Sequence, residues 1–121
     1  MTQVLIVDDD VHVLRLLTEI MEREGYQVRQ ASDGAHAHLA FAEQPADLVI
    51  TDLLMPNKEG LELIQELRDI NPDVKIIAYS GGGQMAPDAY LQFAEGMGAN
   101  RVFSKPIPVD ELVQAVKELL A

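Results

Sequence analysis

The hydrophobic residues fall into two alternating patterns, short continuous runs and longer runs with a helical period. Continuous runs such as residues 4–7 and 48–51 are typical of strands buried on both faces of a sheet. Longer segments place an apolar side chain every three or four residues, as Leu14, Leu17 and Met21 do, and this predicts amphipathic helices. The expected strands cover residues 4–7, 26–31, 48–51, 74–79 and 101–104, and the expected helices cover residues 11–24, 34–43, 59–70, 87–97 and 108–120.

Capping and turn residues stand at the ends of these segments. Asp10 and Asp33 precede the first two helices, where a carboxylate accepts hydrogen bonds from the free N–H groups of the first turn. Gly25 and Gly98 follow the first and the fourth expected helices, where a left-handed backbone often ends a helix. Pro108 suits the start of the last helix because no intrahelical hydrogen bond is lost there.

Strand and helix alternate five times, which predicts an α/β fold with a parallel sheet, helices on both faces and right-handed crossovers. The 121 residues are too few for an eight-unit barrel, so we expect an open, doubly wound (βα)5 sheet. We expect one domain over residues 1–121, with no output domain. Ligands of such sheets bind at the carboxyl ends of the strands.

Chemically complementary side chains follow four of the expected strands. Asp8 and Asp9 follow the first strand, Asp52 the third, Ser80 the fourth and Lys105 the fifth. Taken singly, such carboxylates are often helix caps, such a serine is often a turn residue, and such a lysine is usually a solvated charge. The combination is more specific because this fold gathers all of these strand ends at one edge.

Three carboxylates at one edge repel one another unless they are protonated or bind a cation. Oxygen ligands with no Cys or His beside them suit Mg²⁺, with Mn²⁺ as an alternative. A carboxylate such as Asp52 can then act as a nucleophile towards phosphorus and form an acyl phosphate. Lys105 would balance the charge of the phosphoryl oxygens, and the Ser80 hydroxyl would donate a hydrogen bond to one of them.

The sequence resembles the receiver domain of two-component response regulators, of the single-domain, chemotaxis-regulator-like type, across essentially the whole chain. The segments that carry this resemblance read VLIVDDD, VITDLLMP, IIAYSGG and VFSKP. The resemblance implies a flavodoxin-like fold with strand order 2-1-3-4-5. It also implies a signalling switch and not an enzyme, since a receiver catalyses only its own phosphorylation and dephosphorylation.

The resemblance assigns roles to the acidic residues. Asp52 corresponds to the phosphoacceptor. Asp8 and Asp9 correspond to the acidic pair that holds Mg²⁺ together with Asp52, with one of the pair usually acting through a water molecule. Leu54 takes the place of the residue whose backbone carbonyl ligates the metal.

Ser80 corresponds to the switch hydroxyl residue and Lys105 to the family's lysine, whose peptide bond to Pro106 is usually cis. The implied partners are a sensor histidine kinase or a histidine phosphotransfer protein, which donates the phosphoryl group, and a downstream protein target. The alternative is that the chain is an isolated receiver of a longer regulator.

Two features depart from the family pattern. Val102 stands where the family carries an aromatic switch residue, and the neighbouring Phe103 is expected on the opposite face of its strand. The loop that begins with glycines 81–83 is longer than is common, and it is either a flexible connector or a segment that reorders when Ser80 engages the phosphoryl group.

The composition narrows the classes of partner. Lys and Arg number 9 against 20 Asp and Glu, a formal net charge of −11, so direct binding to nucleic acid or to anionic membranes is not expected. Cysteine is absent, which excludes disulfides and thiolate chemistry. The amino terminus has neither a basic signal region nor a long apolar run, so we expect a cytoplasmic protein.

Other functions fit less well. A Mg²⁺-dependent phosphatase with an aspartyl nucleophile would need an acid two residues after Asp52, where Leu54 stands. A flavin or nucleotide carrier would not place three carboxylates where the ligand phosphate binds. A receiver-like module that has lost phosphorylation would not need the intact residue set. His12, His36 and His38 lack the spacing of a metal site and are expected to be exposed helix residues.

Overall fold

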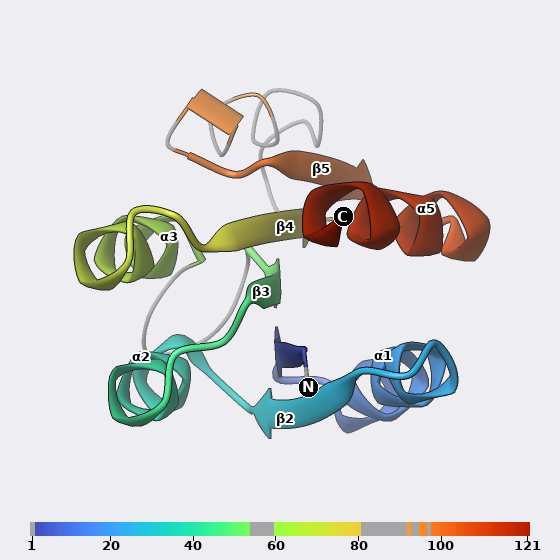
Figure 1. Ribbon diagram of the computed structural model, residues 1–121, viewed down its shortest axis with the longest axis horizontal. Helices are drawn as coiled ribbons and strands as arrows, with labels where there is room; N and C mark the ends of the chain where they lie inside the picture. Colours follow the sequence, from blue (N-terminus) through green and yellow to red (C-terminus); the bar gives the residue numbers. More distant parts are fainter. Residues whose placement is uncertain (1, 54–59, 81–91, 93–94, 97) are drawn as a thin grey trace.

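The computed structural model describes residues 2–53, 60–80, 92, 95–96 and 98–121. It contains one parallel sheet, as the sequence predicted, in the order β2-β1-β3-β4-β5 that the family resemblance implied (Figure 1). The strands are β1 (Gln3–Val7), β2 (Gln27–Ala31), β3 (Leu48–Asp52), β4 (Lys75–Ser80) and β5 (Arg101–Ser104). The helices are α1 (Val11–Arg23), α2 (Gly34–Glu43), α3 (Gly60–Ile70) and α5 (Val109–Leu120). The helix expected over residues 87–97 falls almost entirely outside the described residues.

The capping predictions for Asp10, Asp33 and Gly25 are confirmed, and the one for Pro108 is shifted by a single residue. The carboxylate of Asp10 accepts a hydrogen bond from the His12 N–H at 2.9 Å, and that of Asp33 accepts one from the His36 N–H at 2.8 Å. Gly25 adopts a φ of +93° after α1, which explains why glycine ends this helix. Pro108 lies at the N-cap, so α5 begins one residue later than expected.

The helices cover the two faces of the sheet in pairs, α1 with α5 and α2 with α3 (Figure 1). Side chains of β1 alternate between the two layers: Val4 and Ile6 pack towards α1 and α5, whereas Leu5 and Val7 pack towards α2 and α3. All four are fully buried, which is why this strand reads as a continuous apolar run.

The register of the strands brings the predicted site residues to one edge. Val7 pairs with Thr51 across β1 and β3, so Asp8 follows β1 beside the end of β3, where Asp52 lies. Asp52 in turn pairs with Tyr79 of β4, which places Ser80 one residue further along. Ser80 pairs with Ser104 of β5, and Lys105 comes next. Parallel pairing therefore converts distant sequence positions into neighbours.

Gly60 sets how closely α3 approaches the end of β3. A Cβ atom added at Gly60 would lie 2.6 Å from both the carbonyl oxygen of Asp52 and the Cα atom of Leu53, closer than real contacts allow. The Gly60 N–H also donates a hydrogen bond to the Leu53 carbonyl at 3.0 Å. Close packing at this glycine thus helps to fix the backbone that carries Asp52.

Within the described part of the chain, no helix combines the length and the apolar character that a membrane crossing requires.

Candidate functional site

Three carboxylates meet at the carboxyl edge of the sheet, as the sequence predicted. Asp8, Asp9 and Asp52 each offer an oxygen atom, and these oxygens lie within 4.8 Å of one another. Asp8 is fully buried and Asp52 is 5% exposed, whereas Asp9 is exposed to solvent. The cluster is therefore a buried pair of carboxylates with a third at its mouth.

The buried carboxylate of Asp8 is held by two donors. Its Oδ1 accepts a hydrogen bond from the Asp10 N–H at 2.9 Å, and its Oδ2 accepts one from the Tyr79 hydroxyl at 2.5 Å. Burial raises the pKa of Asp8 above its ordinary value of 3.8; the two hydrogen bonds and Lys105 oppose this effect, and the negative charge of Asp52 adds to it. The ionised form of Asp8 is thus disfavoured by burial and only partly compensated by its hydrogen bonds.

The donor set fits a hard divalent cation. All the ligand atoms are carboxylate oxygens, the ligands that Mg²⁺ prefers. Oxygens grouped within 4.8 Å of one another are close enough to surround one ion, either directly or through the waters that Mg²⁺ usually keeps.

Lys105 forms an ion pair with Asp52, one of the two buried carboxylates of the cluster. Its Nζ lies 3.1 Å from Oδ2 of Asp52, and its backbone N–H donates to the Ser80 carbonyl at 3.1 Å. Burial disfavours the lysine charge, but attraction to Asp52, and then to Asp8 and Asp10, outweighs it and raises the pKa of Lys105 above its ordinary value. The lysine is therefore cationic and in contact with the expected phosphoacceptor. The Lys105–Pro106 peptide bond is cis, as expected.

Ser80 contributes a buried hydroxyl that has no hydrogen-bond partner among the described residues. The residue is 1% exposed, and within the described part of the chain its Oγ makes no hydrogen bond. An unpaired buried hydroxyl is costly, so it marks a position where an acceptor oxygen would be stabilised. This is what the predicted contact with a phosphoryl oxygen requires.

Tyr79 is the site residue that the sequence reasoning missed. It is fully buried in β4, its hydroxyl binds Asp8, and its ring centroid lies 5.4 Å from Nζ of Lys105. Burial, and then the charge of Asp8, raise the pKa of Tyr79, so its hydroxyl remains a donor. A tyrosine in a buried strand, directly before a strand-end serine, was a usable signal because its hydroxyl needs a partner.

The other predictions have mixed outcomes. Val102 packs against the α2 and α3 layer and Phe103 against the α1 and α5 layer, which confirms their opposite directions. Leu54 and the glycines 81–83 lie outside the described residues. The prediction that His38 is exposed was wrong: it is half-buried, and its Nδ1 contacts the Glu66 carboxylate across α2 and α3.

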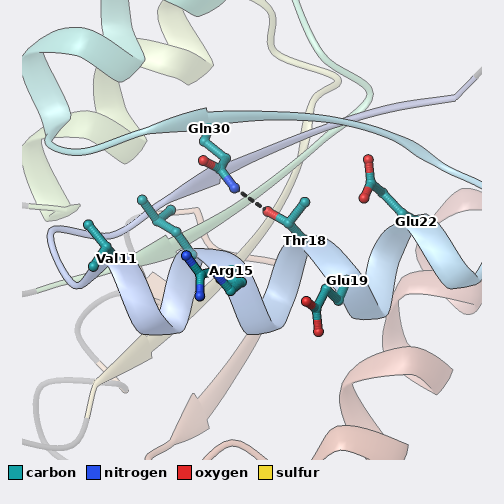
Figure 2. A pocket seen from close by; sticks show the side chains of 7 residues that line it. Val11, Arg15, Thr18, Glu19, Glu22 and Gln30 are labelled. Atoms are coloured by element: carbon teal, nitrogen blue, oxygen red, sulfur yellow. Dashed lines mark hydrogen bonds between the residues drawn. The ribbon is translucent and has the colours of Figure 1, made fainter.

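A pocket between α1 and the edge strand β2 is separate from the carboxylates. Figure 2 shows Arg15, Thr18 and Gln30 around it, with the Gln30 side-chain amide donating to the Thr18 hydroxyl at 2.7 Å. Its lining includes none of the predicted site residues, so it does not extend the site.

Comparison with known proteins agrees with this geometry. The family model described as "Response regulator receiver domain" matches residues 4–117. Sporulation initiation phosphotransferase F of Bacillus subtilis is 32% identical over 98% of this chain and 93% of its own length. Response regulator receiver protein CpdR of Brucella abortus is also 32% identical, over 99% of this chain and 98% of its own length.

Among solved structures, the receiver domain of NtrX from Brucella abortus superposes with a TM-score of 0.89 at 28% identity, covering 97% of both chains. Fold, site geometry and sequence similarity lead to the same family. The chain belongs to the response regulator receiver domains of two-component systems.

Proposed function

We propose that this receiver is a switch that accepts a phosphoryl group on Asp52 from the phosphohistidine of a sensor histidine kinase or a histidine phosphotransfer protein. The observation that carries the proposal is the contact between Lys105 Nζ and Asp52 Oδ2 at 3.1 Å, beside two further carboxylates and an unpaired buried hydroxyl. A nucleophile, a cation and a hydrogen-bond donor are therefore grouped around the place where phosphoryl oxygens would lie.

The transfer itself is a substitution at phosphorus. A carboxylate oxygen of Asp52 forms a bond to phosphorus while the P–N bond to the donor imidazole breaks, and the imidazole nitrogen keeps the electron pair and takes a proton. Lys105 then moves its hydrogen bond from the carboxylate to a phosphoryl oxygen. In the same state the Ser80 hydroxyl gains the acceptor that it lacks in the described structure.

The carboxylates of Asp8, Asp9 and Asp52 would hold Mg²⁺, and the family pattern adds the backbone carbonyl of Leu54. When bound, Mg²⁺ supplies positive charge against the phosphoryl oxygens. The chain's own residues orient the acceptor and balance its charge. Burial, and to a smaller extent the charge of Asp52, raise the pKa of Asp8, so the metal-free cluster holds a disfavoured negative charge that a cation would stabilise.

Phosphorylation would act by shifting a two-state equilibrium. Movement of Ser80 and Lys105 towards the phosphoryl group would be passed to the backbone at the ends of β4 and β5, which a hydrogen bond joins. A strongly acidic chain with a net charge of −11 suits an output through protein contacts more than through nucleic acid. We propose that residues 1–121 act as one receiver, either alone or as part of a longer regulator.

An apolar pocket beside Lys105 supports a protein donor. The pocket, of about 240 Å³, is lined by Val13 and Leu16 of α1, by Lys105 itself and by Pro106 and Val109. Leu16 is 53% exposed, although it is a large apolar side chain. Since Lys105 borders both the pocket and Asp52, a donor that reaches Asp52 would also cover this pocket.

The proposed contact between a donor protein and this pocket can be tested by comparing two kinds of donor. Leu16→Ser should slow transfer from phosphorylated histidine kinases of the source genome by severalfold, yet leave acceptance from acetyl phosphate intact. Leu39→Ser is the matched control, since Leu39 is similarly exposed but lies on α2. An equal fall in the transfer rate in both variants would contradict the proposed contact. A fall in Leu16→Ser with both kinds of donor would contradict it as well.

The function itself is tested by intact mass. After incubation with acetyl phosphate and Mg²⁺, we expect one added phosphoryl group per chain, absent with EDTA and absent in Asp52→Asn. Asp69→Asn, at an exposed carboxylate of α3, controls for the loss of one negative charge. A wild-type protein that gains no Mg²⁺-dependent adduct would refute the proposal.

A further inference from the structure

Tyr79 places a polar hydroxyl in an otherwise apolar layer of the core. The residue is fully buried among side chains of α1 and α5, where phenylalanine would fill nearly the same volume. Burying a hydroxyl costs free energy unless it is hydrogen-bonded, and this one donates to Oδ2 of Asp8 at 2.5 Å. Core packing therefore does not require the hydroxyl, and its role is the hydrogen bond to the Asp8 carboxylate.

The hydroxyl completes a two-point hold on the Asp8 carboxylate. The Asp10 N–H binds Oδ1 at 2.9 Å, and that bond alone leaves the carboxylate able to rotate about its own Cβ–Cγ bond. With Tyr79 on Oδ2, the plane of the carboxylate is fixed. Each oxygen of an ionised carboxylate has about two lone pairs, so one remains on each for a further partner.

The ring of Tyr79 has a second contact in the same site. Its centroid lies 5.4 Å from Nζ of Lys105, within range of a cation–π attraction. The same lysine contacts Asp52 at 3.1 Å. One side chain of β4 thus touches a residue of the carboxylate cluster through its hydroxyl and the cation of the site through its ring.

We propose that Tyr79 is a positioning residue of the Mg²⁺ site: its hydroxyl fixes the orientation of the Asp8 carboxylate for the ion, while its ring helps to place Lys105 beside Asp52. The inference rests on the proposed Mg²⁺-dependent function. Hydrogen-bond donors behind metal-binding groups orient them, and their loss costs about 10- to 100-fold in metal affinity.

The hydroxyl and the ring can be separated by substitution. Tyr79→Phe deletes the hydroxyl and keeps the ring, so we expect the Mg²⁺ dissociation constant to rise by about tenfold or more. The Mg²⁺ concentration for half-maximal phosphorylation by acetyl phosphate should rise by a similar factor, whereas the rate at saturating Mg²⁺ should fall by a smaller factor. Tyr79→Leu removes the ring as well and should lower the saturating rate further.

The decisive experiment is calorimetric titration of the metal-free protein with MgCl2, for the wild type, Tyr79→Phe and Tyr26→Phe. Tyr26 is the matched control because it is a partly buried tyrosine of the same core layer, after α1 and away from the carboxylates. Near-ultraviolet tyrosine difference spectra on adding Mg²⁺ give a second readout, and we expect the signal to vanish in Tyr79→Phe and to persist in Tyr26→Phe. Thermal melts of both variants verify that they are folded.

Weaker Mg²⁺ binding in Tyr79→Phe, with wild-type binding in Tyr26→Phe, supports the positioning role. Equal or tighter binding in a folded Tyr79→Phe overturns the role and leaves the proposed function standing. A wild-type protein that binds no Mg²⁺ overturns both the positioning role and the proposed Mg²⁺-dependent function. The two failures are therefore distinguishable, since only the second abolishes Mg²⁺ binding in the wild type.

Discussion

Asp8→Asn should stabilise the metal-free protein, although Asp8 belongs to the functional site. The side chain is fully buried, and burial together with the charge of Asp52 raises its pKa. Asparagine has nearly the same shape, so its carbonyl oxygen can accept from the Asp10 N–H and its amide can donate to the Tyr79 hydroxyl oxygen. The substitution thus removes a repelling charge and keeps a hydrogen bond to each partner, with the Tyr79 hydroxyl now acting as the acceptor.

The magnitude follows from Coulomb's law. At an effective dielectric constant of about 20, two unit charges on carboxylate oxygens within 4.8 Å of each other repel by about 3.5 kcal/mol or more. Lys105 offsets part of this repulsion, so we expect a net gain of about 1–2 kcal/mol in the free energy of unfolding. For a chain of this size, each kcal/mol raises Tm by about 3–5 °C.

The assay is thermal unfolding in EDTA between pH 3 and pH 8, compared with unfolding in Mg²⁺. Because the folded pKa of Asp8 lies above its ordinary value of 3.8, the penalty is present above the folded pKa and disappears below 3.8. The advantage of Asp8→Asn should therefore be greatest near neutral pH and shrink as the pH falls. In Mg²⁺ the order should reverse, since the wild type binds the ion better.

A metal-free Asp8→Asn protein that melts below the wild type at pH 7 would refute the electrostatic reasoning. So would a stability difference that grows as the pH falls. Asp69→Asn, at an exposed carboxylate, is the control and should change Tm little.

Three further predictions concern other residues. Gly60→Ala should cost about 2–3 kcal/mol in urea unfolding because its Cβ would lie 2.6 Å from the Asp52 carbonyl oxygen and from Leu53 Cα. A cost no greater than that of Gly96→Ala, where nothing lies within 4 Å of the added Cβ, would contradict this. Arg68→Met should lower the free energy of unfolding by about 2–3 kcal/mol because the guanidinium donates to several backbone carbonyls. Arg68→Lys should not restore this stability, and a lysine variant as stable as the wild type in urea would contradict the prediction. Lys105→Met should bind Mg²⁺ about tenfold more tightly in calorimetry, because the variant loses a cation that lies 3.1 Å from Asp52. Weaker binding would show that Lys105 does not compete with Mg²⁺ for the Asp52 carboxylate.

The fold was predictable because its signals are local. Continuous apolar runs, caps at Asp10 and Asp33 and glycine after α1 each act within a few residues. The grouping of Asp8, Asp52 and Ser80 was also predictable, since parallel strands must end at one edge.

Contacts that depend on packing between distant elements could not be read in this way. Tyr79 reaches Asp8 although β3 lies between their strands, and no pairing rule links the two positions. His38 and Glu66 meet because α2 and α3 pack side by side, which the apolar pattern of either helix does not reveal. Arg68 of α3 donates to the carbonyl of Gly98, a residue 30 positions later that precedes β5, and no pattern within either segment links the two.

The most direct test of the central claim is to locate the phosphoryl group. The protein is incubated with acetyl phosphate and Mg²⁺, then treated with borohydride, which reduces an acyl phosphate of aspartate to homoserine, and its peptides are sequenced by mass spectrometry. We predict homoserine at position 52 alone, and none when Mg²⁺ is removed with EDTA. Homoserine at position 8 or 9, or a stable phosphoryl group on another residue with Asp52 unchanged, would contradict the account.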